Sequence, residues 1–195
     1  LFMCLITPVV GAINTALYSG LEAMGEGSKI VLGIVLAGMM AVDMGGPFNK
    51  AAYVFGTSTL ATMAAGQGSD IMATVMIGGM VPPIAIALAT TFFRNRFTED
   101  ERKSGVVNYI MGLCFITEGA IPFAASDPLR VLPACIVGSG VAGALSMAFG
   151  CALPAPHGGI FVFPVMTNIL GYVVALVVGS LVGMILLGLL KKKKA

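Results

Sequence analysis

The length of its uncharged stretches limits how this chain can fold more than any other feature. No Asp, Glu, Lys or Arg occurs from Val131 to Leu190, and none occurs from Ile71 to Phe93. A helix of roughly 20 apolar residues crosses the hydrocarbon core of a bilayer. The alternation of polar and apolar residues that a membrane β-barrel needs is missing, so helices must satisfy the backbone in lipid. The sequence therefore predicts an all-α, polytopic membrane protein.

Composition supports this class and excludes others. Charged residues make up 10% of the chain and hydrophobic residues 57%, whereas about a quarter of a soluble domain is charged. A net charge of +2 without basic-aromatic clusters predicts no nucleic-acid partner. The cysteines lie in apolar segments without CxxC spacing, so we expect small buried side chains and neither a disulfide framework nor a metal site; they are Cys4, Cys114, Cys135 and Cys151. No cofactor motif is present.

Several apolar stretches are long enough to cross the membrane. The expected spans are Leu1–Gly20 with a kink at Pro8, Ile71–Phe93 interrupted by Pro82-Pro83, Leu129–Cys151, and Asn168–Leu190. A further apolar stretch, Ile30–Val42, is too short to cross alone. The chain opens inside an apolar run without an initiator Met or a recognisable signal peptide, so we expect it to be part of a longer protein.

The basic residues predict the orientation. Eight of the eleven Lys and Arg residues lie in the loop 94–104 or in the basic tail 191–195, and the positive-inside rule places both in the cytoplasm. Parity then requires Gly105–Asp127 to enter and leave on the same side, as a re-entrant hairpin. Thr98 and Glu101 have capping-box spacing, which predicts a helix start, and Asp127-Pro128 predicts another. The topology of residues 1–69 stays open.

Three sites combine polar residues and helix breakers within apolar sequence: Asp43–Lys50, Thr117–Pro122 and Pro154–Gly159. Irregular backbone at membrane depth is tolerated only where protein buries it or water fills a cavity. Ionisable side chains there are costly and mark substrate pathways, and transporters build their sites from interrupted helices. We therefore expect these interruptions to meet around a polar substrate.

Glu118 and His157 are the first candidates for substrate contact. A carboxylate at the tip of a hairpin can accept charge-assisted hydrogen bonds from several hydroxyls, although it could also tie the tip to a Lys or to backbone amides. His157, the single histidine, can donate and accept at once; a packed, structurally satisfied His is the alternative. The Pro before it and the glycines after it predict unwound backbone.

Secondary candidates lie beside them. Asn49 carries an amide suited to sugar hydroxyls, and Thr117 precedes the candidate carboxylate. For Lys50 we weigh a binding role equally against an ion pair. Asp43 is expected to be its structural partner rather than a sugar contact, and Asp127 is expected to be a capping or interface charge.

The three interrupted sites resemble enzyme IIC, the membrane component of fructose-family phosphotransferase permeases. The resemblance is carried by Asp43-Met44-Gly45-Gly46-Pro47-Phe48-Asn49-Lys50-Ala51-Ala52-Tyr53, by Ile116-Thr117-Glu118-Gly119-Ala120-Ile121-Pro122-Phe123, and by Pro154-Ala155-Pro156-His157-Gly158-Gly159. Their order matches through nearly the whole chain, which is therefore identified as the C-terminal portion of such a transmembrane domain.

The resemblance implies a homodimeric permease of the bacterial inner membrane, with re-entrant hairpins around the sugar and a cytoplasmic C-terminus. It implies that Glu118 binds sugar and makes His157 a candidate for a second contact, although the Gly-Gly-Pro-Phe-Asn-Lys loop is an alternative. The phosphoryl group comes from an enzyme IIB partner phosphorylated on Cys, which this chain does not supply. Without the N-terminal helices of a complete enzyme IIC, we expect no normal transport or phosphorylation by the fragment alone.

Two alternatives remain. An ion-coupled secondary transporter would use Asp43 and Glu118 for protons or sodium, and a membrane scaffold or sensor would use the polar interruptions only for packing. The sugar itself is open: fructose is expected first, with mannose-like, mannitol-like or glycosylated acid substrates as other possibilities.

Overall fold

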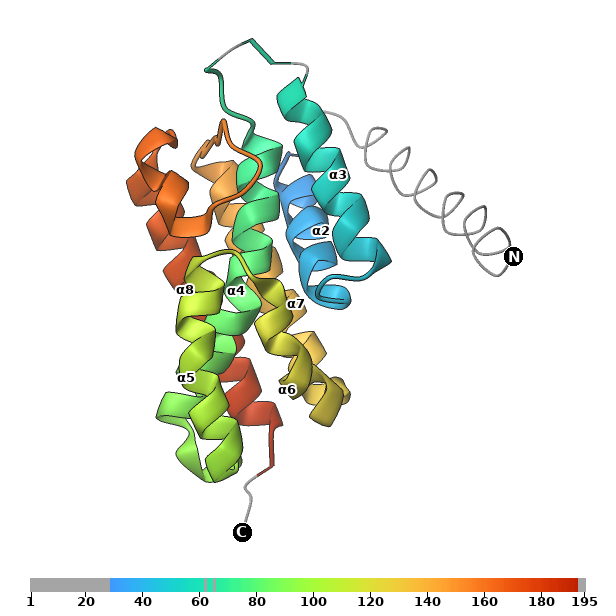
Figure 1. The fold of residues 1–195 in the computed structure, drawn as a ribbon, viewed down its shortest axis with the longest axis vertical. Helices are drawn as coiled ribbons and strands as arrows, with labels where there is room; N and C mark the ends of the chain where they lie inside the picture. The colour runs from blue at the N-terminus through green and yellow to red at the C-terminus, as the bar shows by residue number, and fades with distance from the viewer. Residues whose placement is uncertain (1–28, 62, 65, 193–195) are drawn as a thin grey trace, which may run out of the picture.

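The computed structural model describes residues 29–61, 63–64 and 66–192, and this part of the chain consists mainly of helices joined by short irregular segments (Figure 1). The predicted span at Leu1–Gly20, with Pro8 and Cys4, lies outside the described residues. Within the described residues, three helices are long and apolar enough to cross a membrane: α4 (Asp70–Phe92), α7 (Pro128–Ala148) and α8 (Ile169–Leu190). The all-α membrane class is confirmed, and the predicted spans agree with these helices to within a few residues.

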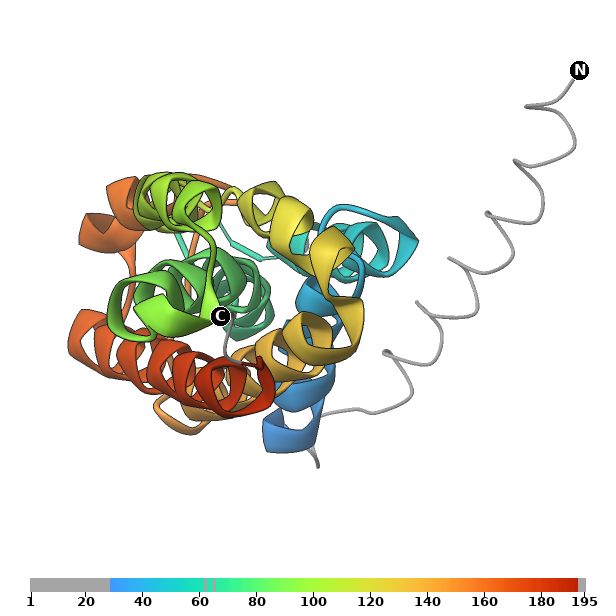
Figure 2. The ribbon, with the colours of Figure 1, turned by 90° about the horizontal axis from the view of Figure 1, so that it is seen from below.

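Helix α4 forms the centre of the bundle. In the most apolar 18-residue stretch of α4, 83% is buried inside the molecule. The corresponding share for α8 is 39%, and the outer surface of α8 is apolar and exposed. Viewed from one end, α4 lies inside a ring made by α2, α5, α7 and α8 (Figure 2). A helix that is apolar on all sides belongs in such a position, because it has no polar face to turn toward water.

Helix α4 is continuous through Pro82 and Pro83, so the predicted interruption at these residues is wrong. A proline inside a helix removes the hydrogen bond to the carbonyl four residues earlier. Here the two carbonyls left without a helical partner belong to Gly78 and Gly79. In a membrane such groups must find other donors.

Two hydroxyl groups from other elements supply those donors. The Ser139 hydroxyl on α7 donates to the Gly78 carbonyl at 2.9 Å. The Thr117 hydroxyl donates to the Gly79 carbonyl at 3.0 Å. The proline pair therefore joins α4 to α7 on one side and to the loop after α5 on the other, which keeps the helix intact and fixes the position of Thr117.

Glycines allow the neighbouring helices to approach closely. A Cβ atom on Gly179 of α8 would lie 2.6 Å from the carbonyl oxygen of Gly138 on α7, and one on Gly183 would lie 2.9 Å from Ala85 on α4. The GxxxG pattern of α8 is therefore used for packing within this chain. Small residues serve this purpose in membrane bundles because they admit close backbone contact.

Two helical pairs reverse direction near the middle of the molecule (Figure 1). The first comes from the upper half and the second from the lower half, so their tips approach each other. Their parts are α2 (Lys29–Val42) and α3 (Pro47–Ala61), then α5 (Glu99–Leu113), the short 3-10 helix η3 (Thr117–Ala120) and α6 (Ile121–Ser126). The reversal at η3 has the shape expected of a hairpin; its depth in a membrane stays a prediction.

The starts of α5 and α7 lie close to the predicted positions. The capping box at Thr98 and Glu101 is present, with both reciprocal hydrogen bonds. Because α5 begins at Glu99, the predicted loop 94–104 is shorter than expected and contains the first turns of α5 after η2 (Arg94–Arg96). Helix α7 begins at Pro128 as predicted, but the Asp127 carboxylate makes no cap and instead accepts from Arg130 at 3.0 Å.

The first residue of the basic tail is part of the structure. Lys191 is only 2% exposed. Its ammonium nitrogen lies 3.0 Å from the Glu101 carboxylate and 4.3 Å from the centre of the Phe97 ring. The Arg96 guanidinium donates to the Lys191 carbonyl. This Lys191 cluster (Arg96, Phe97, Glu101 and Lys191) joins the end of α8 to the start of α5.

Cysteines outside the first segment follow the expectation in part. Cys135 and Cys151 are buried, whereas Cys114 is half-buried, and all three are free thiols.

Candidate functional site

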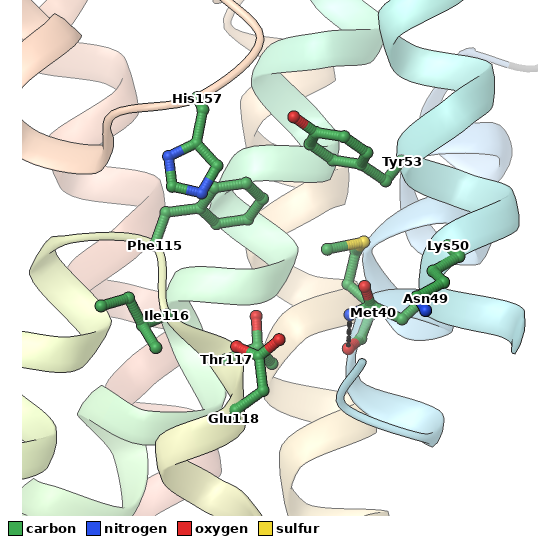
Figure 3. Close-up of a pocket in the computed structure, with 9 residues that line it drawn as sticks. All are labelled: Met40, Asn49, Lys50, Tyr53, Phe115, Ile116, Thr117, Glu118 and His157. Atoms are coloured by element: carbon green, nitrogen blue, oxygen red, sulfur yellow. Dashed lines mark hydrogen bonds between the residues drawn. The ribbon is translucent and has the colours of Figure 1, made fainter. Parts of the chain in front are cut away.

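A cavity of about 300 Å³ lies where the two hairpin tips meet the loop before η4 (Gly159–Val165). Figure 3 shows its lining: Met40, Asn49, Lys50, Tyr53, Phe115, Ile116, Thr117, Glu118 and His157. All five predicted site residues are among these nine. Its volume is at the lower end of the range for small-molecule sites, about 300–1,000 Å³, which suits a ligand of monosaccharide size.

The turn that presents Glu118 is a Schellman motif at the end of α5. The Ile116 N–H donates to the Met111 carbonyl at 2.8 Å, and the Phe115 N–H donates to the Gly112 carbonyl at 3.1 Å. Phe115 occupies the left-handed position of this motif with φ +63°, where glycine is usual. A non-glycine residue there costs on the order of 1–3 kcal/mol. Such strain is typical of functional sites. Here the left-handed conformation places the Phe115 ring in the wall of the cavity.

The Glu118 carboxylate is exposed at the tip of the hairpin. Among the described residues it makes no hydrogen bond and no salt bridge, so the expected alternative, a structural tie to Lys or to backbone amides, is not seen there. Gly45, with φ +119°, lies opposite, and a Cβ atom at that position would come within 3.2 Å of the carboxylate. A glycine therefore leaves room for the carboxylate and for a ligand beside it.

Thr117 is fixed more firmly than its neighbour. Its side chain is 4% exposed, and its hydroxyl proton is used in the bond to the Gly79 carbonyl. A hydroxyl that donates one bond retains lone pairs that can accept another. Thr117 therefore positions the tip on α4 and can offer only an acceptor to the cavity.

Asn49 is held by two contacts at the start of α3. Its Nδ2 donates to the Met40 carbonyl at 2.9 Å in the last turn of α2, and its backbone N–H donates to the Asp43 carboxylate at 2.9 Å. Asp43 also accepts from the Phe48 N–H at 2.7 Å. One N–H of the Asn49 amide is thus committed to the fold, and its Oδ1 atom and second N–H are left for a ligand.

The expected pairing of Asp43 with Lys50 is wrong. The first N–H groups of a helix have no partner within the helix, and a carboxylate at that end satisfies them and complements the helix dipole. Asp43 serves α3 in this way. Lys50 is exposed and forms no salt bridge within the described residues, so the cavity holds an ammonium and a carboxylate that do not pair with each other.

His157 lies on the opposite wall, in irregular backbone as predicted. Its ring centroid is 5.0 Å from that of Phe115 with the planes tilted by 54°, and Phe115 lies 6.3 Å from Tyr53. Figure 3 shows these three rings on one side of the cavity and Asn49, Thr117 and Glu118 on the other. The cavity thus has an aromatic side and a hydrogen-bonding side.

Four lining residues were not predicted: Met40, Tyr53, Phe115 and Ile116. Two signals in the sequence pointed to them. Tyr53 is one helical turn after Asn49, and Phe115 and Ile116 directly precede the Thr117-Glu118 pair. The left-handed backbone of Phe115 could not be read from residue type, because phenylalanine rarely adopts it. No group of three or more metal-ligating side chains occurs within the described residues.

Comparison with known proteins finds close relatives. The chain is 52% identical over 186 residues to the PTS system fructose-specific EIIABC component of Bacillus subtilis, covering 95% of this chain and 28% of that protein. It is 50% identical over 186 residues to the Fructose permease IIC component of Bacillus amyloliquefaciens, covering 95% and 59%. It is 53% identical over 189 residues to the PTS system fructose-specific EIIB'BC component of Rhodobacter capsulatus, covering 95% and 32%.

The chain therefore spans between 28% and 59% of the length of these relatives. No family model matches it, and no solved structure matches it.

Proposed function

We propose that this chain, which belongs to the fructose-specific enzyme IIC family of phosphotransferase permeases, forms a sugar-binding part of such a permease. The observation that carries the proposal is the cavity in which Glu118, His157 and Asn49 converge from three separate segments. Fructose or a fructose-like sugar is the proposed ligand, because the relatives carry fructose in their names.

The two sides of the cavity suit the two kinds of surface on a sugar. Glu118 accepts charge-assisted hydrogen bonds from hydroxyl groups, which are stronger than neutral ones. The Asn49 Oδ1 atom and the Thr117 hydroxyl add acceptors, and His157 can both donate and accept. The rings of Phe115 and Tyr53 lie against the C–H groups of the sugar.

The two hairpins suggest how the sugar crosses. Their tips approach from opposite ends of the bundle, so a movement of either would open the cavity toward one side. We propose that the cavity opens first to the outside and then to a phosphodonor on the cytoplasmic side. An enzyme IIB partner supplies the phosphoryl group. Residence in the bacterial inner membrane, a cytoplasmic C-terminus and a homodimer belong to the same proposal.

The ion-coupled alternative is not favoured. It requires Asp43 and Glu118 to bind an ion together, but Asp43 is engaged as the cap of α3 through two backbone N–H groups. It also predicts uptake that collapses with the ion gradient and survives the loss of phosphoenolpyruvate. The proposal made here expects the reverse.

The test is uptake and phosphorylation of fructose by the complete gene product carrying Glu118→Gln. Loss of a charge-assisted hydrogen bond, worth about 1.5–3 kcal/mol, should weaken sugar affinity by roughly 10- to 150-fold. Asp100→Asn is the matched control, because Asp100 is exposed and does not line the cavity. Unchanged affinity and rate in the Glu118 variant would remove this carboxylate from the site.

A further inference from the structure

A second polar cavity, of about 310 Å³, lies at the lower end of the bundle between the last turn of α4 and the first turns of α5. It is separate from the sugar cavity and shares no residue with it. Its charged lining residues are Arg94, Arg102, Lys103 and Glu99. Figure 2, which looks onto this end, shows the start of α5 at the periphery of the bundle.

The charges in this second cavity are not balanced. Glu99 pairs with Lys103 at 3.0 Å. The guanidinium groups of Arg94 and Arg102 are then the charges of the cavity that no carboxylate in its lining balances. Neither Arg94 nor Arg102 forms a salt bridge within the part of the chain that the structure describes, and the Nε atom of Arg102 is buried without a hydrogen-bond partner. An anion in the cavity would meet the two guanidinium groups, each of which carries further N–H donors.

The position of the cavity indicates where that anion comes from. Helix α4 has 23 residues, so its length of about 34 Å is enough to cross a hydrocarbon core. Thr90 and Thr91, in its last turn, line the cavity, which places the cavity at the boundary between lipid and water. Thr91 also shares a 2.9 Å hydrogen bond with the Tyr109 hydroxyl, and tyrosine is enriched at this boundary.

An apolar surface adjoins the charged groups. Val106 lines the cavity and is 61% exposed, and Ile110, one turn further along α5, is 69% exposed. A free phosphate ion would make no favourable contact with this apolar surface, whereas the acyl chains of a lipid would cover it. Arginine suits the headgroup because its planar fork binds phosphate oxygens in pairs, and basic pockets between membrane helices are known to hold anionic headgroups.

We propose that this cavity binds the phosphate group of an anionic membrane lipid, with Arg94 and Arg102 as its ligands and with the acyl chains along Val106 and Ile110. The lipid would lie beside the segment that begins α5, the helix whose other end presents Glu118. The proposal does not depend on the function of the sugar cavity.

The test uses the complete gene product in detergent, titrated with phosphatidylglycerol and observed by native mass spectrometry. We expect saturable retention of one lipid per chain, and no such retention of phosphatidylcholine. Each basic residue near a membrane surface contributes on the order of fivefold to lipid affinity, so the double variant Arg94→Gln/Arg102→Gln should weaken binding about 25-fold. Lys192→Gln is the matched control, since Lys192 is an exposed cation near the same end that lines neither cavity.

Further measurements keep the result interpretable. If the double glutamine variant melts at a lower temperature, the variant Arg94→Lys/Arg102→Lys replaces it, and this variant should bind more weakly than the unmodified protein but more tightly than the glutamine one. An equal loss in the Lys192 variant would overturn the proposal in favour of diffuse attraction. Full displacement of the lipid by millimolar inorganic phosphate would overturn it in favour of a free-anion site. An acidic protein domain that occupies this face while phosphatidylglycerol has no effect would also overturn it.

Discussion

The pair Lys191 and Glu101 and the pair Lys50 and Glu118 are used in opposite ways. Lys191 and Glu101 lie 3.0 Å apart with side chains 3% and 17% exposed, and the lysine also covers the Phe97 ring. Lys50 and Glu118 line one cavity, yet form no ion pair within the described residues. The first combination holds two helix ends together. The second leaves both charges available, which is what a binding site for a polar ligand requires.

The largest effect should come from breaking the paired combination. Lys191→Met removes the ammonium that lies 3.0 Å from the largely buried Glu101 carboxylate, and we expect the free energy of unfolding to fall by about 3 kcal/mol, as for other broken buried pairs. Reversible unfolding in mixed micelles measures this. Lys192→Met is the control and should change it by less than about 0.5 kcal/mol. Equal stability of the two variants would mean that the Lys191 cluster does not hold α5 to α8.

At His157 in the cavity, substitution should act on sugar affinity and not on stability. His157→Ala removes an exposed ring that donates and accepts, and we expect sugar affinity to fall up to about tenfold, the value of one ordinary hydrogen bond. Isothermal titration with fructose measures the change, and unfolding in micelles should be unaltered. His157→Gln retains a donor and an acceptor and should lose less. A lower stability with normal affinity would make His157 a structural residue.

A sharper comparison uses the hydroxyl groups of Ser139 and Thr117. These donate to the two α4 carbonyls that have no helical partner because of the proline pair. Ser139→Ala and Thr117→Val should each destabilise the protein by about 1 kcal/mol, since such bonds in membranes are worth about 0.6–2 kcal/mol. Only the Thr117 variant should also weaken fructose binding, because only Thr117 lines the cavity. Thr117→Ser should restore both properties. An equal effect of the Ser139 variant on fructose affinity would indicate that stability alone governs binding.

The smallest effect is expected at Lys50. Lys50→Met should leave the free energy of unfolding within about 0.5 kcal/mol of the unmodified value, because Lys50 makes no ion pair with any of the residues that the structure describes. Fructose affinity should fall only a few-fold, since a neutral sugar needs no counter-charge. The same two measurements test this. A loss of stability near that of Lys191→Met would remove the distinction between the two lysines.

Sequence reasoning found the site because helix breakers and charges in apolar sequence are conspicuous. Glu118, His157 and Asn49 stood out for this reason, and the structure brings them to one cavity, although their binding role stays a prediction. The features that sequence reasoning missed depend on contacts between residues that are far apart in the chain. The continuity of α4 rests on Ser139 and Thr117, which are far from Pro82-Pro83 in the chain.

Other errors have the same origin. The pairing of Asp43 with Lys50 was expected because opposite charges attract, but the Asp43 carboxylate accepts from two N–H groups at the start of α3. The burial of Lys191 was hidden within a run of identical residues, and its partner Glu101 is 90 residues away. Local patterns in the sequence predicted the elements, whereas the choice between competing partners required the fold.

The most direct test of the account is carbodiimide labelling of carboxylates in the complete gene product, with and without fructose, read by peptide mass spectrometry. We predict that Glu118 is labelled in the free protein and protected by fructose, with no protection by glycerol. Glu101, paired with Lys191, should stay largely unlabelled under both conditions. Labelling of Glu118 that fructose does not change would contradict the claim that the Glu118 carboxylate binds the sugar.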